Sequence, residues 1–77
     1  MLIPSETEEY IQLKNETEEF NFFASQNKMT GMIVMWTENK QGKEIEQKRI
    51  FPKELYPKNP TPLIAALHQI AYLTQGE

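Results

Sequence analysis

A run of five apolar residues, 32–36, lies between Gly31 and the polar stretch 37–42. Successive side chains of a strand point to opposite faces, so an apolar run without alternation is typical of a strand that is covered on both sides. The run therefore predicts a central strand over 31–38. A chain of 77 residues, however, has few other residues with which to cover both faces of this strand.

The two faces of this strand are expected to have different covers. We expect Val34 and Trp36, together with Met32, to lie under a C-terminal helix. The alternate residues, Ile33 and Met35, are expected to pack against the N-terminal segment or against another chain. We therefore expect that a partner could bind at the face formed by Ile33 and Met35.

A hairpin follows the apolar run. Residues 43–51 form a second strand-like run, and the polar loop 39–42 ends in Gly42, which can adopt a positive φ angle. If the loop has four residues, Trp36 faces Ile45 across the hairpin. Charged residues alternate along this second strand, a pattern typical of an exposed sheet edge.

The C-terminal segment predicts an amphipathic helix over 62–75. Thr61 is a suitable N-cap, Pro62 suits the first helical position, and Gly76 stands where helices commonly end. One helical face is formed by Leu63, Leu67, Ile70, Ala71 and Thr74. Tyr72 is expected to point away from that face.

Residues 5–27 are compatible with two interpretations. Two similar acidic stretches, 5–10 and 15–20, each place Glu three residues after an N-cap residue type, which favours helix starts. The aromatic segment Phe20–Ala24 is also compatible with a strand, which leaves residues 16–27 open between helix and strand. We expect an acidic, helical N-terminal segment packed on a hairpin, and the alternative is a three-stranded antiparallel meander. The echo between the two stretches is attributed to coincidence in capping residues.

The fold class predicted from these elements is α+β, with residues 1–77 forming a single domain. Residues 1–20 contain six Glu and one Lys, hence a charge of −5, whereas residues 21–77 contain seven Lys or Arg and five Glu, hence +2. The chain has no cysteine, no stretch that could span a bilayer and no secretory signal at its start. We expect a cytoplasmic protein.

No combination of residues indicates catalysis. The chain has no Cys, no Asp and a single histidine, His68, so the usual nucleophilic triads cannot be assembled. Clusters of metal ligands and phosphate-binding glycine loops are also missing, so we expect neither a metal nor a cofactor. The sequence predicts a protein that is not an enzyme.

The leading hypothesis is a small protein-interaction module, an adaptor or an inhibitor that masks a partner's surface, and the hypothesis includes a homodimer. Small acidic chains of this kind are common among phage and mobile-element products, and an origin of that kind is part of the hypothesis. Aromatic and Met side chains adapt to partners, and they supply most of the candidate partner contacts. These candidates are Ile33, Met35, Phe22, Phe23 and Tyr72.

The alternative hypothesis is a nucleic-acid-binding module. Basic residues gather in and after the hairpin, and a two-stranded ribbon can enter a groove of a duplex. Glu residues interrupt this patch and the whole chain has a net charge of −3, which weakens binding to phosphates. The candidate nucleic-acid contacts are Lys40, Lys43, Lys48, Arg49, Lys53 and Lys58.

Overall fold

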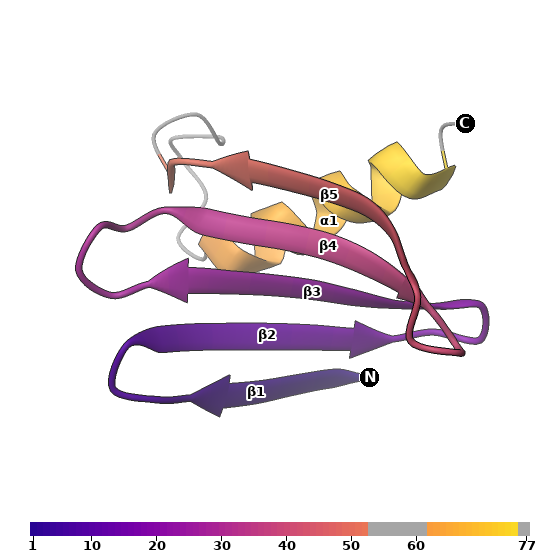
Figure 1. The fold of residues 1–77 in the computed structure, drawn as a ribbon, viewed down its shortest axis with the longest axis horizontal. Coiled ribbons are helices and arrows are strands. Elements are labelled where there is room, and N and C mark those ends of the chain that lie inside the picture. The colour runs from indigo at the N-terminus through magenta and orange to yellow at the C-terminus, as the bar shows by residue number, and fades with distance from the viewer. Residues whose placement is uncertain (53–61, 76–77) are drawn as a thin grey trace.

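The computed structural model describes residues 1–52 and 62–75 of the chain. These residues form five strands and one helix: β1 (Leu2–Glu6), β2 (Tyr10–Glu16), β3 (Phe20–Asn27), β4 (Ile33–Asn39), β5 (Glu44–Ile50) and α1 (Pro62–Gln75). The strands pair antiparallel in chain order and form a single meandering sheet (Figure 1). The helix α1 packs on one face of the sheet, against β2 to β5.

The predicted α+β class is confirmed, and so are the strand 31–38, the strand 43–51 and the helix 62–75, to within two residues at each end. The prediction of a helical N-terminal segment is wrong. Residues 2–27 contribute three further strands, so the sheet has five strands where two or three were expected. Thr61 and Gly76, the two expected end signals of the helix, lie outside the described residues.

Two equivalent turns explain why the N-terminal prediction was wrong. The backbone N–H of Thr7 donates to Tyr10 O at 2.8 Å, and that of Thr17 donates to Phe20 O at 2.9 Å. In each turn the Thr Oγ1 accepts a bond from the backbone N–H three residues later, at 3.0 Å for Tyr10 and 3.2 Å for Phe20. The echo between residues 5–10 and 15–20 is therefore a repeated hairpin turn with two Glu at its tip, rather than a coincidence of helix caps.

The core lies between the sheet and α1. It consists of the buried residues Phe22, Ala24, Ile33, Met35, Ile50, Ala66, Leu67 and Ile70. Thr37, which is also fully buried, is bonded to Thr74 of the helix. The sheet side that faces α1 is thus formed by the odd-numbered positions of β4 and the even-numbered positions of β3.

The expected covers of β4 are reversed. Ile33 and Met35 are fully buried under α1, whereas Val34 and Trp36 lie on the opposite side and are only half-buried. No second layer covers that side among the described residues. The indole N–H of Trp36 needs a hydrogen-bond acceptor. Acceptors are available at a solvent-exposed surface and are scarce in this apolar core, which favours the outer side of the sheet for Trp36.

The β4–β5 hairpin has a tighter turn than expected. Asn39 N donates to Lys43 O at 2.9 Å, so three residues form the loop, and Gly42 adopts a φ angle of +85°. A register shift between Thr37 and Glu38 follows, and Trp36 pairs with Gln47 in place of Ile45. The prediction that β5 forms a charged edge strand is confirmed.

Candidate binding surface

The candidate partner contacts are divided by the fold. Ile33, Met35 and Phe22 are buried in the core, with at most 2% of their surface exposed, so they cannot contact a partner in the folded chain. Tyr72 lies on the outer side of α1 and is 76% exposed, as expected. Phe23 projects from the sheet on the side opposite α1. The two accessible candidates therefore lie on opposite sides of the molecule.

The sheet side opposite α1 is covered by no other described element, and we call it the open face. In Figure 1 it is turned toward the viewer, with α1 behind the sheet. Strand pairing arranges most of its side chains in three rows that cross the strands, and the pair Tyr10–Asn27 lies beyond them on the same face. The middle row holds Ile3, Lys14, Phe23, Trp36 and Gln47, the second row holds Ser5, Gln12, Ser25, Val34 and Arg49, and the third holds Glu16, Asn21, Glu38 and Glu44.

An aromatic pair occupies the middle of the open face. Phe23 of β3 and Trp36 of β4 are direct cross-strand neighbours, with ring centroids 4.8 Å apart and planes inclined by only 5°. Both side chains are half-buried although no layer covers them, because each ring shields the other. Such a pair adds about 0.5–1.5 kcal/mol beyond the area that it buries.

Charged side chains hold this pair in place from both ends. The ammonium group of Lys14 lies 5.4 Å from the centroid of the Phe23 ring and 3.2 Å from the carboxylate of Glu16. The indole N–H of Trp36 donates to Glu38 Oε2 at 2.8 Å. Three contacts with charged groups, together with the ring stack, hold the aromatic side chains in this orientation.

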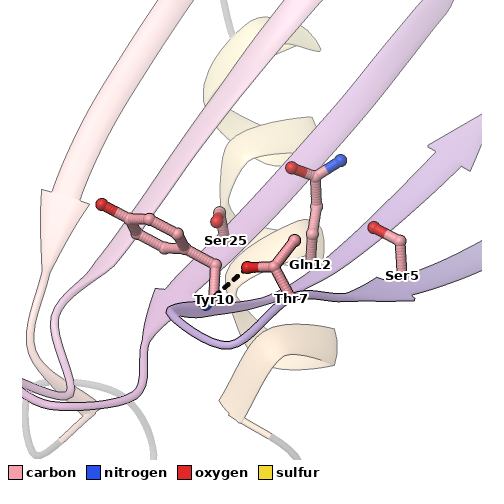
Figure 2. A pocket seen from close by; sticks show the side chains of 5 residues that line it. All are labelled: Ser5, Thr7, Tyr10, Gln12 and Ser25. Atoms are coloured by element: carbon pink, nitrogen blue, oxygen red, sulfur yellow. Dashed lines mark hydrogen bonds between the residues drawn. The ribbon is translucent and has the colours of Figure 1, made fainter.

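A polar depression adjoins the aromatic pair near the β1–β2 turn. It has a volume of about 180 Å³ and is lined by Ser5, Thr7, Tyr10, Gln12 and Ser25, which project from the open face in Figure 2. None of these side chains is charged at neutral pH. The volume is below the roughly 300–1,000 Å³ of small-molecule sites, so the depression suits a single polar side chain of a larger partner.

The candidate nucleic-acid contacts do not share one surface. Lys40 and Lys43 lie at the β4–β5 turn, where Lys40 Nζ donates to Asn21 Oδ1 at 3.0 Å. Lys48 pairs with Met35 on the α1 side of the sheet, whereas Arg49 pairs with Val34 on the open face. Lys53 and Lys58 were also proposed and lie outside the described residues.

In residues 1–52 and 62–75, no group of three or more histidine or acidic side chains is arranged to hold a metal ion. That part of the chain also lacks a helix with the length and apolar character needed to cross a bilayer.

Sequence reasoning missed Trp36 as a surface residue because it assigned that side chain to the core. The available signal was the chemistry of alternate positions: Trp36 and Glu38 are two residues apart on one strand face, where an indole N–H and a carboxylate can bond. Tyr10 and Gln12, which line the depression, were missed because their strand was expected to be helical.

Comparisons with protein-family models, with curated proteins and with solved structures found no match to this chain.

Proposed function

We propose that the chain is a non-enzymatic protein-interaction module, an adaptor or inhibitor, and that the open face is its binding surface. The observation that carries the proposal is the Phe23–Trp36 pair at the centre of a sheet face that no other described element covers. Aromatic side chains dominate the energetics of protein interfaces, particularly where they are rigid and central. A polar rim with both signs of charge surrounds the pair, which is also typical of protein interfaces.

The orientation of the rings favours a protein partner over a single-stranded nucleic acid. Nucleobases stack on exposed ring faces, and this stacking supplies much of the binding free energy. Here one face of the Phe23 ring stacks on Trp36 and Lys14 lies over the same ring, so Phe23 offers its edge rather than a free face to a partner. Edges of aromatic rings are well suited to contact with aliphatic side chains and carbonyl groups.

Electrostatics support the same choice. The three rows of the open face contain two cations, Lys14 and Arg49, and three carboxylates, Glu16, Glu38 and Glu44. The chain as a whole carries a net charge of −3. Phosphate contacts dominate nucleic-acid affinity, and this face has no excess of cations to make them.

Site-specific photo-crosslinking tests the proposal. A photo-reactive residue is placed at Gln47 on the open face, or at Gln75 on α1, and both variants are irradiated in a lysate of the source cells. Both glutamines are exposed in the folded chain, so they form a matched pair. We expect discrete protein adducts from the Gln47 variant and none from the Gln75 variant. Protein adducts from Gln75 alone, or nuclease-sensitive adducts from Gln47, would contradict the proposal.

The nucleic-acid alternative has its own test. Trp36 is the only tryptophan, so its intrinsic fluorescence reports on the open face. A salt-dependent change of that fluorescence on adding DNA or RNA oligonucleotides, abolished by Lys43→Glu together with Arg49→Glu, would support the alternative. We expect no such change.

A further inference from the structure

We propose that the open face binds a second copy of this chain, so that two sheets pack face to face about a two-fold axis that runs across the strands. This inference rests on the proposed function, because it names a partner for the same surface. It adds a defined geometry and a defined pairing of charges. Face-to-face packing of two sheets, about 10 Å apart, is the usual way in which an uncovered sheet side is buried.

The size of the open face matches what a stable dimer requires. The molecule measures 31 × 26 × 19 Å, and the sheet lies in the plane of the two longer axes (Figure 1). Five strands of about seven residues present roughly 550 Å² in projection, and their accessible surface is larger because side chains project from it; stable interfaces bury about 600–1,000 Å² per partner. The outer side of α1 that carries Tyr72 is a strip only about 21 Å long.

The charges of the open face are segregated along the strand direction. Glu16, Glu38 and Glu44 all lie in one row at one end of the face. The cations Lys14 and Arg49 lie in the two neighbouring rows. The face therefore has an acidic end and a basic remainder, and such a surface can be complementary to itself if one copy is reversed.

This segregation determines the direction of the two-fold axis. An axis parallel to the strands, along β3, would place the acidic row of one copy over the acidic row of the other, with Glu16 of β2 opposite the partner's Glu38 of β4. An axis across the strands reverses the row order, and each strand then lies over its own counterpart. When the axis passes over the middle row, all three rows overlap, and each Arg49 of β5 lies over the partner's Glu44. The two Lys14 side chains then lie near each other, and each is bonded to its own Glu16 at 3.2 Å, which offsets their repulsion. Opposite charges then face each other twice in one interface.

The edges of the sheet are less suitable for association. Met1 and Glu16 exchange both backbone hydrogen bonds, at 3.1 Å each. Because bonded and non-bonded pairs alternate in an antiparallel ladder, the backbone nitrogen of Pro4 points toward the free edge, where it has no hydrogen to donate. Edge-to-edge pairing through β1 is thereby weakened.

Sedimentation of the full chain over a range of micromolar concentrations tests the inference. We expect a concentration-dependent dimer. Ser25→Arg places a bulky charge on the open face and should weaken dimerisation by about tenfold or more, whereas Tyr72→Arg on α1 should have no effect. Circular dichroism checks that each variant is folded. A strict monomer at high micromolar concentration would overturn the inference, as would a dimer that dissociates with Tyr72→Arg and persists with Ser25→Arg.

A charge-swap series tests the axis. Arg49→Glu should weaken the dimer because it places carboxylates opposite each other twice, and the double variant Arg49→Glu, Glu44→Arg should restore most of the affinity, since each pair is re-formed with reversed sign. Absence of restoration would overturn the proposed pairing. The crosslinking at Gln47 distinguishes the two proposals: a strict monomer that crosslinks to other proteins through Gln47 overturns the dimer and leaves the proposed function standing. A dimer whose Gln47 variant crosslinks only to a second copy of the chain leaves the dimer standing and overturns the adaptor or inhibitor role alone.

Discussion

Thr37 of β4 and Thr74 of α1 share a hydrogen bond of 2.7 Å between their hydroxyl oxygens, inside the core. The hydroxyl of Thr74 also donates to the backbone carbonyl of Ile70 at 2.8 Å. A hydroxyl has one hydrogen, so Thr37 must be the donor in the bond that it shares with Thr74. Thr37 is completely buried, and this bond is what makes a polar side chain acceptable at its position.

The direction of this bond predicts unequal effects of two similar substitutions. Thr37→Val removes the donor and leaves Thr74 bonded to Ile70, so it should cost less than about 1 kcal/mol of unfolding free energy. Thr74→Val leaves the buried hydroxyl of Thr37 without a partner and should cost about 1–3 kcal/mol. Urea denaturation of the two variants measures both values.

The double variant is the control for this pair. With both hydroxyls replaced by methyl groups, no unpaired polar group remains, so Thr37→Val combined with Thr74→Val should be closer to the wild type than Thr74→Val alone. Additive losses in the double variant would show that the hydroxyl bond does not stabilise the core in the way described.

The repeated turns give a second prediction. Thr7→Val and Thr17→Val each remove the Oγ1 atom that accepts the backbone N–H of Tyr10 or Phe20. We expect each to lower the unfolding free energy by about 0.5–1.5 kcal/mol, as for the loss of one intramolecular hydrogen bond. Each Thr makes a second bond: Thr17 donates to Phe20 O at 2.9 Å, and Thr7 accepts from Glu9 N at 3.3 Å. The shorter bond of Thr17 should give its substitution the larger effect. Thr30→Val, at an exposed position of the β3–β4 turn, serves as a comparison for the loss of a weaker Thr contact, a bond of 3.3 Å from Met32 N.

These turns also show why the N-terminal half could not be predicted from the sequence. A Thr followed by Glu residues caps a helix as readily as it closes a hairpin, because in both cases Oγ1 accepts a backbone N–H two or three residues later. The choice is made by pairing of β2 with β3, which is a contact between residues far apart in the chain. The helix 62–75 was predictable because Pro62 and the apolar periodicity act locally.

The two faces of β4 were ambiguous for a related reason. Ile33 and Met35 are apolar, and so are Val34 and Trp36, so hydrophobicity alone does not say which pair lies under α1. The three-residue loop with Gly42 and the register shift after Thr37 then moved the cross-strand partners by two positions. The open face could consequently not be predicted once Trp36 was assigned to the core.

Gly42 gives a third prediction. Its φ angle of +85° is unfavourable for any residue with a Cβ atom, although a Cβ built there would contact nothing within 4 Å. Gly42→Ala should therefore destabilise the chain by about 1–2 kcal/mol for conformational reasons alone. Gln41→Ala, one residue earlier and without a positive φ angle, should change stability by no more than about 0.5 kcal/mol. Equal thermal midpoints for the two variants would contradict this account of the turn.

The free edge of β1 gives the last prediction. Pro4 is the one position on this strand whose outward-pointing backbone nitrogen carries no hydrogen, and outward N–H groups are what a second edge strand would bind. Pro4→Val restores a donor at the edge without adding charge, so the variant should form assemblies larger than a dimer, detectable by light scattering and by an amyloid-binding dye. Leu2→Val, on the same edge with its N–H retained, should behave like the wild type. If Pro4→Val sediments as the wild type does, the proline has no role in limiting association, and the free edge of β1 must be protected by its charge and short length instead.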